Sequence, residues 1–468
     1  MNILALLQCL DPSLTATTTK QLSRIIAAML VMTGRVTMLG IARWGGQGGS
    51  YRTVQRFFST VIPWGTLFWV FFREQLWRPG DTYLLAGDEV VVTKAGKRTY
   101  GLDRFFSSLY GKPIPGVSFF ALSLVSVQER HAYPISIEQI VRDEAEKAAS
   151  KIKASSKKKG TGKGKGTDKS KGTDKSKGTD KSKGKPGRPK GSKNKNKAEV
   201  ALSPELGRIK ALVEGLLQRL AGHLPLTYLV LDGHFGNNLA LVMARACSLQ
   251  LISKLRYDSG LYLPYDGPYS GHGPHRKYGK KLAAHALPAE HLQKTVVKDN
   301  IKTDIYQMQL LHKKFCQTLN VVIIVKTNQT NGACAHVCLF SSDLQLAYDQ
   351  LIDYYSLRFQ IEFNFRDAKQ FWGLEDFMNI KANAVTNAAS LSLFMVNFAH
   401  CLLRTFRHTD QADSSVLDLK AFCRGFKYLE ETLKLLPQMP DPVLFTQMLN
   451  NVTRLGRIHP VQTESVAP

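Results

Sequence analysis

Cysteines and long apolar runs are both scarce in this 468-residue chain, and each shortage excludes a class of protein. The seven cysteines are scattered from position 9 to position 423. So few cysteines in so long a chain exclude the disulfide framework of a small secreted domain, and they favour a reducing compartment. The longest apolar stretches are too short for a membrane span or are interrupted by Asn and His. The sequence therefore predicts a cytoplasmic protein with no membrane partner.

Acidic residues are also few, at 37 against 63 lysines and arginines, which gives a formal net charge of +26. Such an excess favours a polyanionic partner, nucleic acid above all. The charge is uneven, because residues 151–197 hold 18 lysines and one arginine against three aspartates, a net of +16. The remaining residues keep a net charge of +10. A basic tail attached to a neutral protein therefore does not account for the excess.

The basic segment lacks aromatic residues altogether and repeats the motif GTDKSK three times, at 166–183. Such a composition cannot bury enough apolar surface to offset chain entropy, so 146–200 is predicted to be a disordered linker. Basic blocks of this kind bind the nucleic-acid backbone without sequence preference. Arg188 and Lys190, in KPGRPKGSK, lie in a pattern that resembles an AT-hook, which binds the minor groove of A·T-rich DNA. A solvated spacer is the alternative for the same residues.

The N-terminal residues 1–78 show helical spacing of apolar residues, with Gly-rich breaks between the helices. Ser50 is a predicted N-cap of one of these helices. Arg52 and Arg56 lie one turn apart on that helix and would share a face. A helix-turn-helix-like DNA-binding domain and a purely structural helical cap both fit this pattern.

The rest of the chain is predicted to be a mixed α/β structure with one core that is interrupted twice. Strand-rich runs and a strand–helix–strand unit imply a sheet with parallel pairing and flanking helices. The predicted parts are 79–145 with three strands of the core, the linker 146–200, 201–256 with the strand–helix–strand unit, a β-rich insertion at 257–342, 343–408 with a helix that carries Glu362, and a helical tail at 409–468.

Two aspartates lie in unusually apolar strands. Asp88 lies in LLAGDEVVV, and Asp232 ends the strand YLVLD. A carboxylate in such a setting is costly unless it is paired or binds a metal. Ligand sites in open α/β sheets gather at the carboxyl ends of strands, which is where Asp232 is placed.

Four polar residues follow one stripe of the predicted helix in YYSLRFQIEFNFRDAKQFWG, residues 354–373. Tyr355, Arg358, Glu362 and Lys369 project within about 60° of one another at 100° per residue. A surface helix with a few salt bridges is the simpler interpretation. With Asp88 and Asp232, however, Glu362 completes three carboxylates that could hold two Mg²⁺ ions about 4 Å apart, with Mn²⁺ as a substitute.

The spacing Tyr355-x2-Arg358-x3-Glu362-x6-Lys369 matches the Tyr-Arg-Glu-Lys signature of one branch of bacterial insertion-sequence transposases. KQFWGLEDF after it also resembles that branch, and the order of strands and helices resembles the ribonuclease-H-like core of DDE transposases. The resemblance implies that Asp88, Asp232 and Glu362 are the catalytic metal ligands. It further implies that Tyr355, Arg358 and Lys369 bind phosphates of the transposon end. The long basic linker between the two aspartates departs from the family pattern.

By this resemblance the chain is a transposase that cleaves DNA and transfers strands in a bacterial, nucleoid-associated setting. Its partners would be double-stranded DNA, namely the terminal inverted repeats and the target, and it would act as a homodimer in the synaptic complex. Two alternatives stay open: a non-catalytic architectural DNA-binding protein, and a Mg²⁺-dependent nuclease of the same core that does not join strands. Short inverted repeats flanking the gene would favour the transposase.

Overall fold

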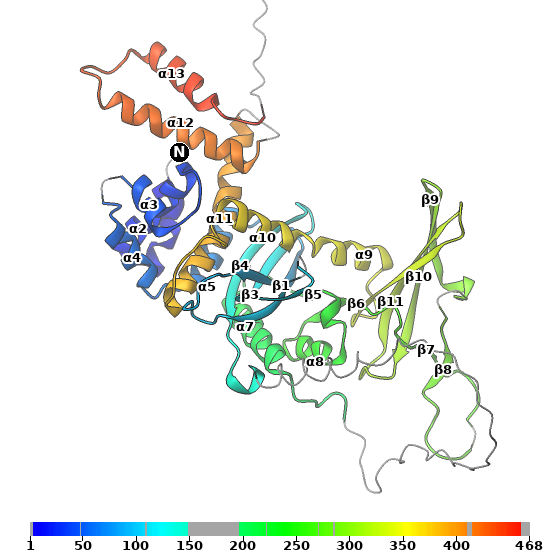
Figure 1. The fold of residues 1–468 in the computed structure, drawn as a ribbon. Helices are drawn as coiled ribbons and strands as arrows, with labels where there is room; N and C mark the ends of the chain where they lie inside the picture. The colour runs from blue at the N-terminus through cyan, green and yellow to red at the C-terminus, as the bar shows by residue number, and fades with distance from the viewer. Residues whose placement is uncertain are drawn as a thin grey trace, which may run out of the picture.

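The computed structural model describes residues 3–46, 48–107, 110–147, 196–220, 222–269, 271–283, 286–409 and 414–459 (Figure 1). The GTDKSK repeats, Arg188 and Lys190 lie outside these residues. Within them the protein is a mixed α/β structure with one large sheet and helices on both of its faces, as the sequence predicts.

The chain begins with a group of short helices that pack on one another. They are α1 (Ile3–Leu7), η1 (Gln8–Ser13), α2 (Ala16–Val31), α3 (Met38–Trp44), α4 (Tyr51–Ser59), α5 (Trp64–Phe71) and η2 (Phe72–Leu76). Ser50 caps α4 as predicted, since its side chain accepts a hydrogen bond from the Thr53 backbone N–H. Asn387 joins this group to a later helix, because its amide donates to the carbonyls of Phe58 and Thr60 and accepts from Trp64.

The first strands of the sheet are β1 (Tyr83–Thr93), β2 (Asp103–Ser107), β3 (Lys112–Ser126) and β4 (His131–Ile140). The short strand β2 was absent from the three strands predicted here. After the basic segment come α7 (Pro204–Leu220), β5 (Tyr228–Leu231), η3 (Gly233–Phe235), α8 (Asn238–Ala246) and β6 (Gln250–Leu255). β3 pairs antiparallel with β4 and β1, whereas β5 pairs parallel with β1 and β6. This arrangement is consistent with a ribonuclease-H-like core.

Residues 257–342 contribute further strands to the same sheet. They are β7 (Leu261–Pro264), β8 (Tyr278–Lys281), β9 (Leu292–Lys298), β10 (Ile301–His312), β11 (Leu319–Asn328) and β12 (Cys334–Ser341), with η4 (Ala289–His291) before β9. β12 pairs antiparallel with β6, so the sheet continues from the core through β12, β11 and β10. The sequence does not indicate this pairing, because it joins strands about 80 residues apart.

The last helices are α9 (Tyr348–Leu357), α10 (Gln360–Phe371), α11 (Ala382–Thr409), α12 (Val416–Leu433) and α13 (Pro442–Arg454). In Figure 1, α9 and α10 cover one face of the sheet, while α7 and α8 lie on the other. α11 is long and apolar enough to cross a membrane by length and composition, but 89% of its most apolar window is buried in the protein. It packs against β4, α4, α10 and α12, as a core helix does.

The predicted single helix through Tyr355 and Lys369 was wrong in one respect. The helical segment is interrupted between Leu357, where α9 ends, and Gln360, where α10 begins. At the interruption, backbone N–H groups bond to carbonyls three residues back, at Phe359, Ile361 and Glu362. This tighter 3₁₀-like turn advances the chain by more than 100° per residue, which shifts the alignment expected for one continuous helix.

Candidate active site

Asp88 lies in the middle of β1, on the face of the sheet that α9 and α10 cover. Its even-numbered neighbours Leu84 and Ala86 pack with Leu351 and Leu357 of α9. Because side chains alternate along a strand, Asp88 points to that same face. Glu89 points to the opposite face, where the Ser118 hydroxyl donates to its carboxylate. The two adjacent acids therefore lie on opposite faces of the sheet.

Asp232 is brought beside Asp88 by strand register. β1 and β5 run parallel with Gly87 opposite Leu231, so Asp88 and Asp232 follow one residue later on neighbouring strands. Asp232 lies directly after β5 and caps η3, since its carboxylate accepts from the His234 N–H at 3.1 Å. The turn that follows is very close to β6, where a Cβ on Gly236 would meet the Lys254 carbonyl oxygen at 2.1 Å. Only glycine allows this approach.

Glu362 reaches the same place from the first turn of α10, and Arg358 links it to Asp88. The Arg358 Nη1 lies 2.7 Å from the Asp88 Oδ2, and its Nη2 lies 3.4 Å from the Glu362 Oε1. The Arg358 side chain is only 12% exposed, whereas that of Glu362 is 43% exposed. Its Nε has no hydrogen-bond partner among the described residues. Arg358 is therefore a nearly buried cation held between two acids.

The pKa of Asp88 reflects this crowded setting. Burial, with a smaller contribution from the negative charges of Asp232 and Glu362, raises the pKa to about 6, while Arg358 and the Glu89 N–H oppose the shift. Asp88 also accepts a hydrogen bond from the Glu89 backbone N–H at 2.8 Å. The mutual influence of the three carboxylates agrees with their convergence on one face of the sheet.

The other two residues of the stripe differ in position. Tyr355 lies near the end of α9, with the Arg358 guanidinium 6.0 Å from its ring centre. Burial raises its pKa, and the charges of Arg358, Asp232 and Asp88 all act on it, so it belongs to the same cluster. Lys369 lies apart from that cluster. Its ammonium donates to the Val91 carbonyl at 3.2 Å and pairs with Glu375 at 2.9 Å.

The donor types of this cluster fit Mg²⁺ and Mn²⁺, which prefer carboxylate oxygen. In the part of the chain that the structure describes, no three acidic, His or Cys side chains are gathered closely enough to hold a metal ion. The Arg358 guanidinium instead occupies the space between Asp88 and Glu362. The sequence analysis did not predict that Arg358 pairs with Asp88 and Glu362, although a spacing of four residues between Arg358 and Glu362 is typical of an ion pair on a helix.

A cavity of about 610 Å³ opens beside Asp232, and no pattern in the sequence indicates it. Its lining includes His234, Glu205, Arg256 and Lys314. The His234 Nε2 lies 3.6 Å from the Glu205 Oε1, and the interaction with this carboxylate raises the pKa of His234. A histidine two residues after Asp232 was the available signal.

The predicted DNA-binding arginines of the N-terminal helices lie far along the chain from this cluster. Arg52 and Arg56 are exposed on α4, while Val54, Phe57 and Phe58 on the same helix are buried. The helix therefore presents both guanidinium groups to solvent.

Two comparisons with known proteins bear on this site. A family model described as DDE superfamily endonuclease matches residues 6–312. The matched region contains Asp88 and Asp232 and ends before Glu362. No curated protein matches the chain.

Proposed function

The chain belongs to the DDE superfamily of endonucleases, and on that premise we propose that it is a transposase that cuts and joins DNA at the ends of an insertion sequence. The observation that carries the proposal is the convergence of Asp88, Asp232 and Glu362 on one face of the sheet. Family membership implies a DNA-cutting enzyme. The step to a transposase of the Tyr-Arg-Glu-Lys branch adds the resemblance of residues 355–369.

In this proposal Asp88, Asp232 and Glu362 would hold two Mg²⁺ ions, which Mn²⁺ could replace, once the Arg358 guanidinium leaves the space between Asp88 and Glu362. Bound there, the ions would activate the attacking oxygen and stabilise the leaving oxygen of a phosphodiester. Arg358 and Tyr355 lie beside the same carboxylates, so their guanidinium and phenol can donate hydrogen bonds to phosphate oxygens of the strand being cut. Lys369 supplies a further cation along β1.

Two successive displacements at phosphorus complete the reaction. In the first, a water oxygen bonds to phosphorus at the transposon end, and the 3′ oxygen leaves as a hydroxyl. In the second, that 3′-hydroxyl attacks a phosphodiester of the target, and a target 3′ oxygen leaves and takes the proton. The partners are the terminal inverted repeats and target DNA, bound by a homodimer in a bacterial cytoplasm.

The outer parts of the chain have roles in the same proposal. Residues 1–78 bind DNA through Arg52 and Arg56, and the basic linker 146–200, with Arg188 and Lys190, adds contacts without sequence preference. Residues 79–145, 201–256 and 343–408 form the ribonuclease-H-like core, with an insertion at 257–342 and a helical tail at 409–468.

Substitution of each carboxylate tests the function. Asp88→Asn, Asp232→Asn and Glu362→Gln should each abolish Mg²⁺-dependent cleavage of a duplex that carries the inverted repeats flanking the gene, with DNA binding nearly retained. Glu89→Gln is the matched control, because Glu89 is adjacent to Asp88 but points to the other face. Loss of binding and cleavage together in all three variants would mean that these acids are structural.

The endonuclease description of the matching family also favours a second candidate, a nuclease that does not join strands. A strand-transfer assay with a pre-cut transposon end and supercoiled target DNA separates the two. Joined products support the transposase, whereas cleavage without joining supports the nuclease.

A further inference from the structure

The strands β9 to β12 form a ribbon that extends the sheet beyond α9 (Figure 1). α9 contacts β6, β11 and β12. Val322 of β11 and Leu339 of β12 pack with α9 in the same cluster as Leu84 and Ala86 of β1. The ribbon therefore has one face that continues the face on which Asp88 lies.

Strand register determines which residues share that face. Ile324 is opposite Val337 and Ile305, and it alternates with Val322, so these side chains point toward the α9 side. The same alternation along β9 to β12, together with the pairing of Lys298 with Ile301, shows which residues lie on this face farther from α9. We call this outer part the ribbon face, and it consists of Lys294, Val296, Lys298, Ile301, Lys326 and Val337.

The charges of the ribbon face are all of one sign. Lys294, Lys298 and Lys326 are exposed, and none has an ion-pair or hydrogen-bond partner within the described ranges. No carboxylate of β9–β12 shares the face, because Asp304 points to the opposite side and pairs there with Lys302 at 2.9 Å. A face with three unneutralised cations and no acid is complementary to a polyanion.

Apolar side chains lie between these cations and are unusually exposed. Val296, Ile301 and Val337 are 41%, 39% and 40% exposed. Exposed apolar groups within a polar surface mark contact sites, and methyl groups beside ammonium groups suit the sugars and phosphates of a nucleic-acid backbone.

The hairpin that carries two of the lysines has a defined turn. β9 and β10 are joined by Asp299 and Asn300, with φ of 50° and 58°. Two left-handed residues between paired strands give a tight turn whose twist matches that of the strands, and Asp and Asn tolerate this conformation. The register of Lys294 and Lys298 is therefore fixed before any ligand binds.

From this placement we propose that the ribbon face binds the phosphate backbone of the duplex whose end is cut, outside α9 and on the same face as Asp88 and Glu362. The inference rests on the proposed function, since it needs a DNA substrate at the carboxylates. It adds a second place of contact, away from the cutting site, that would hold the duplex across the sheet.

The test measures binding of the inverted-repeat duplex by full-length protein over a range of salt concentrations. All variants carry Asp88→Asn, so that cutting does not consume the duplex. The combined Lys294→Gln, Lys298→Gln and Lys326→Gln variant should bind more weakly and should lose about 0.9 from the slope of log K against log salt for each phosphate contact removed. Lys302→Gln is the matched control on the opposite side of the ribbon, and its slope should stay at the parent value.

Each other outcome overturns the proposal. An unchanged slope in the triple variant, or an equal loss from Lys302→Gln, means that the ribbon face does not bind DNA. If instead Val296→Ser and Ile301→Ser change the sedimentation coefficient while the lysine variants bind normally, the face is a contact between copies of this chain. Cleavage by the otherwise wild-type protein is measured separately, so failure of the proposed function and failure of this inference are distinguishable.

Discussion

At the scale of single residues, the two cations of the stripe near Glu362 have different surroundings. Arg358 is nearly buried between Asp88 and Glu362, and no other cation among the described residues pairs with either acid. Lys369 is held by Glu375 and the Val91 carbonyl. A buried ion whose partner is removed costs more than a screened surface pair, so the two residues should differ in their importance.

Substitution of Arg358 should therefore impair end cleavage more than substitution of Lys369. Arg358→Lys keeps the charge but loses the two-pronged contact with Asp88 and Glu362. Loss of a charge-assisted contact of about 1.5–3 kcal/mol predicts a roughly tenfold to hundredfold lower cleavage rate. Lys369→Ala should lower the rate less. The measurement is the rate of end cleavage at saturating Mg²⁺, with unfolding temperature as a check on folding.

Arg366→Ala is the control for both variants. Arg366 is an exposed cation on α10, the helix that also carries Lys369, and it pairs with the adjacent Asp367 at 3.2 Å. Its substitution should leave the cleavage rate unchanged. Equal losses in all three variants would mean that these cations contribute only their positive charge and that their specific contacts do not matter.

At the scale of elements, two side chains of α12 form hydrogen bonds with the C-terminal end of α2. The Lys420 ammonium donates to the Met29 carbonyl, and the Arg424 Nε donates to the Val31 carbonyl at 3.0 Å. Both carbonyls belong to the last turn of α2, where no intrahelical donor is available. Lys420 is 8% exposed and lies over the Trp372 ring. The N-terminal helices and the C-terminal hairpin of α12 and α13 are joined by these contacts.

The burial of Lys420 predicts a pH dependence of stability. Burial lowers its pKa from 10.5 to about 8, so between those pH values the unfolded chain binds the proton that the folded protein has released. The free energy of unfolding that Lys420 contributes should therefore rise as pH increases from about 8 to 10.5. The measurement is the difference in chemical unfolding free energy between wild type and Lys420→Met across that range.

Lys427→Met is the control on the same helix. The hydrogen bond that the Lys427 ammonium donates to Glu431 raises the pKa of Lys427. The stability that Lys427 contributes is therefore present below its unfolded-state pKa and is lost as pH rises through its folded-state pKa. The difference in unfolding free energy between wild type and Lys427→Met should therefore not rise as pH increases from about 8 to 10.5. A flat difference for Lys420 would show that its amine is solvated in the folded protein.

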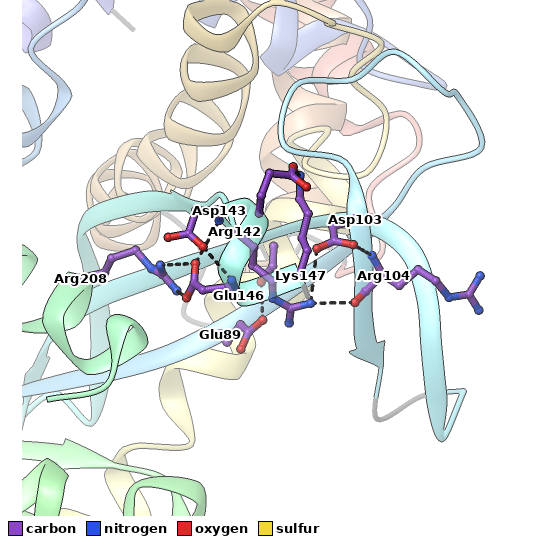
Figure 2. A network of polar contacts seen from close by, with 10 residues as sticks. Glu89, Asp103, Arg104, Arg142, Asp143, Glu146, Lys147 and Arg208 are labelled. Atoms are coloured by element: carbon purple, nitrogen blue, oxygen red, sulfur yellow. Dashed lines mark hydrogen bonds and ion pairs between the residues drawn. The ribbon is translucent and has the colours of Figure 1, made fainter. Parts of the chain in front are cut away.

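At the scale of the whole molecule, the residues at the two ends of the basic segment form hydrogen bonds with different elements: α7 at one end, and α8 and Lys313 at the other. Before the segment, Glu146 accepts two hydrogen bonds at 3.0 Å from Arg208 of α7, within the polar network of Figure 2. At its last residue, the Lys197 ammonium donates to the Lys313 carbonyl, and the Asn238 amide donates to the Lys197 carbonyl. A change inside the segment can therefore leave both anchors intact.

Replacement of residues 151–195 by a neutral Gly-Ser sequence of equal length should weaken binding to any duplex. It removes a net charge of +15 and should reduce the slope of log K against log salt. Thermal unfolding should stay unchanged, because such a composition cannot contribute to a core. An unchanged salt slope would mean that the segment is only a spacer, and a lower unfolding temperature would contradict the predicted lack of a structural role.

What the sequence by itself determined was local. Alternating and apolar runs predicted β1, β5 and β6 around Asp88 and Asp232, and Ser50 predicted the start of α4, because period and capping are properties of a few adjacent residues. The carboxylates could be singled out because an acid in an apolar strand is rare. The position of Arg358 between two acids, the interruption of the helix before Gln360 and the engagement of Lys369 by Glu375 were decided only in the tertiary structure. So was the pairing of β12 with β6, which brings the ribbon face into line with Asp88. Each of these depends on contacts between segments distant in the chain, and no local pattern of residues encodes such a contact.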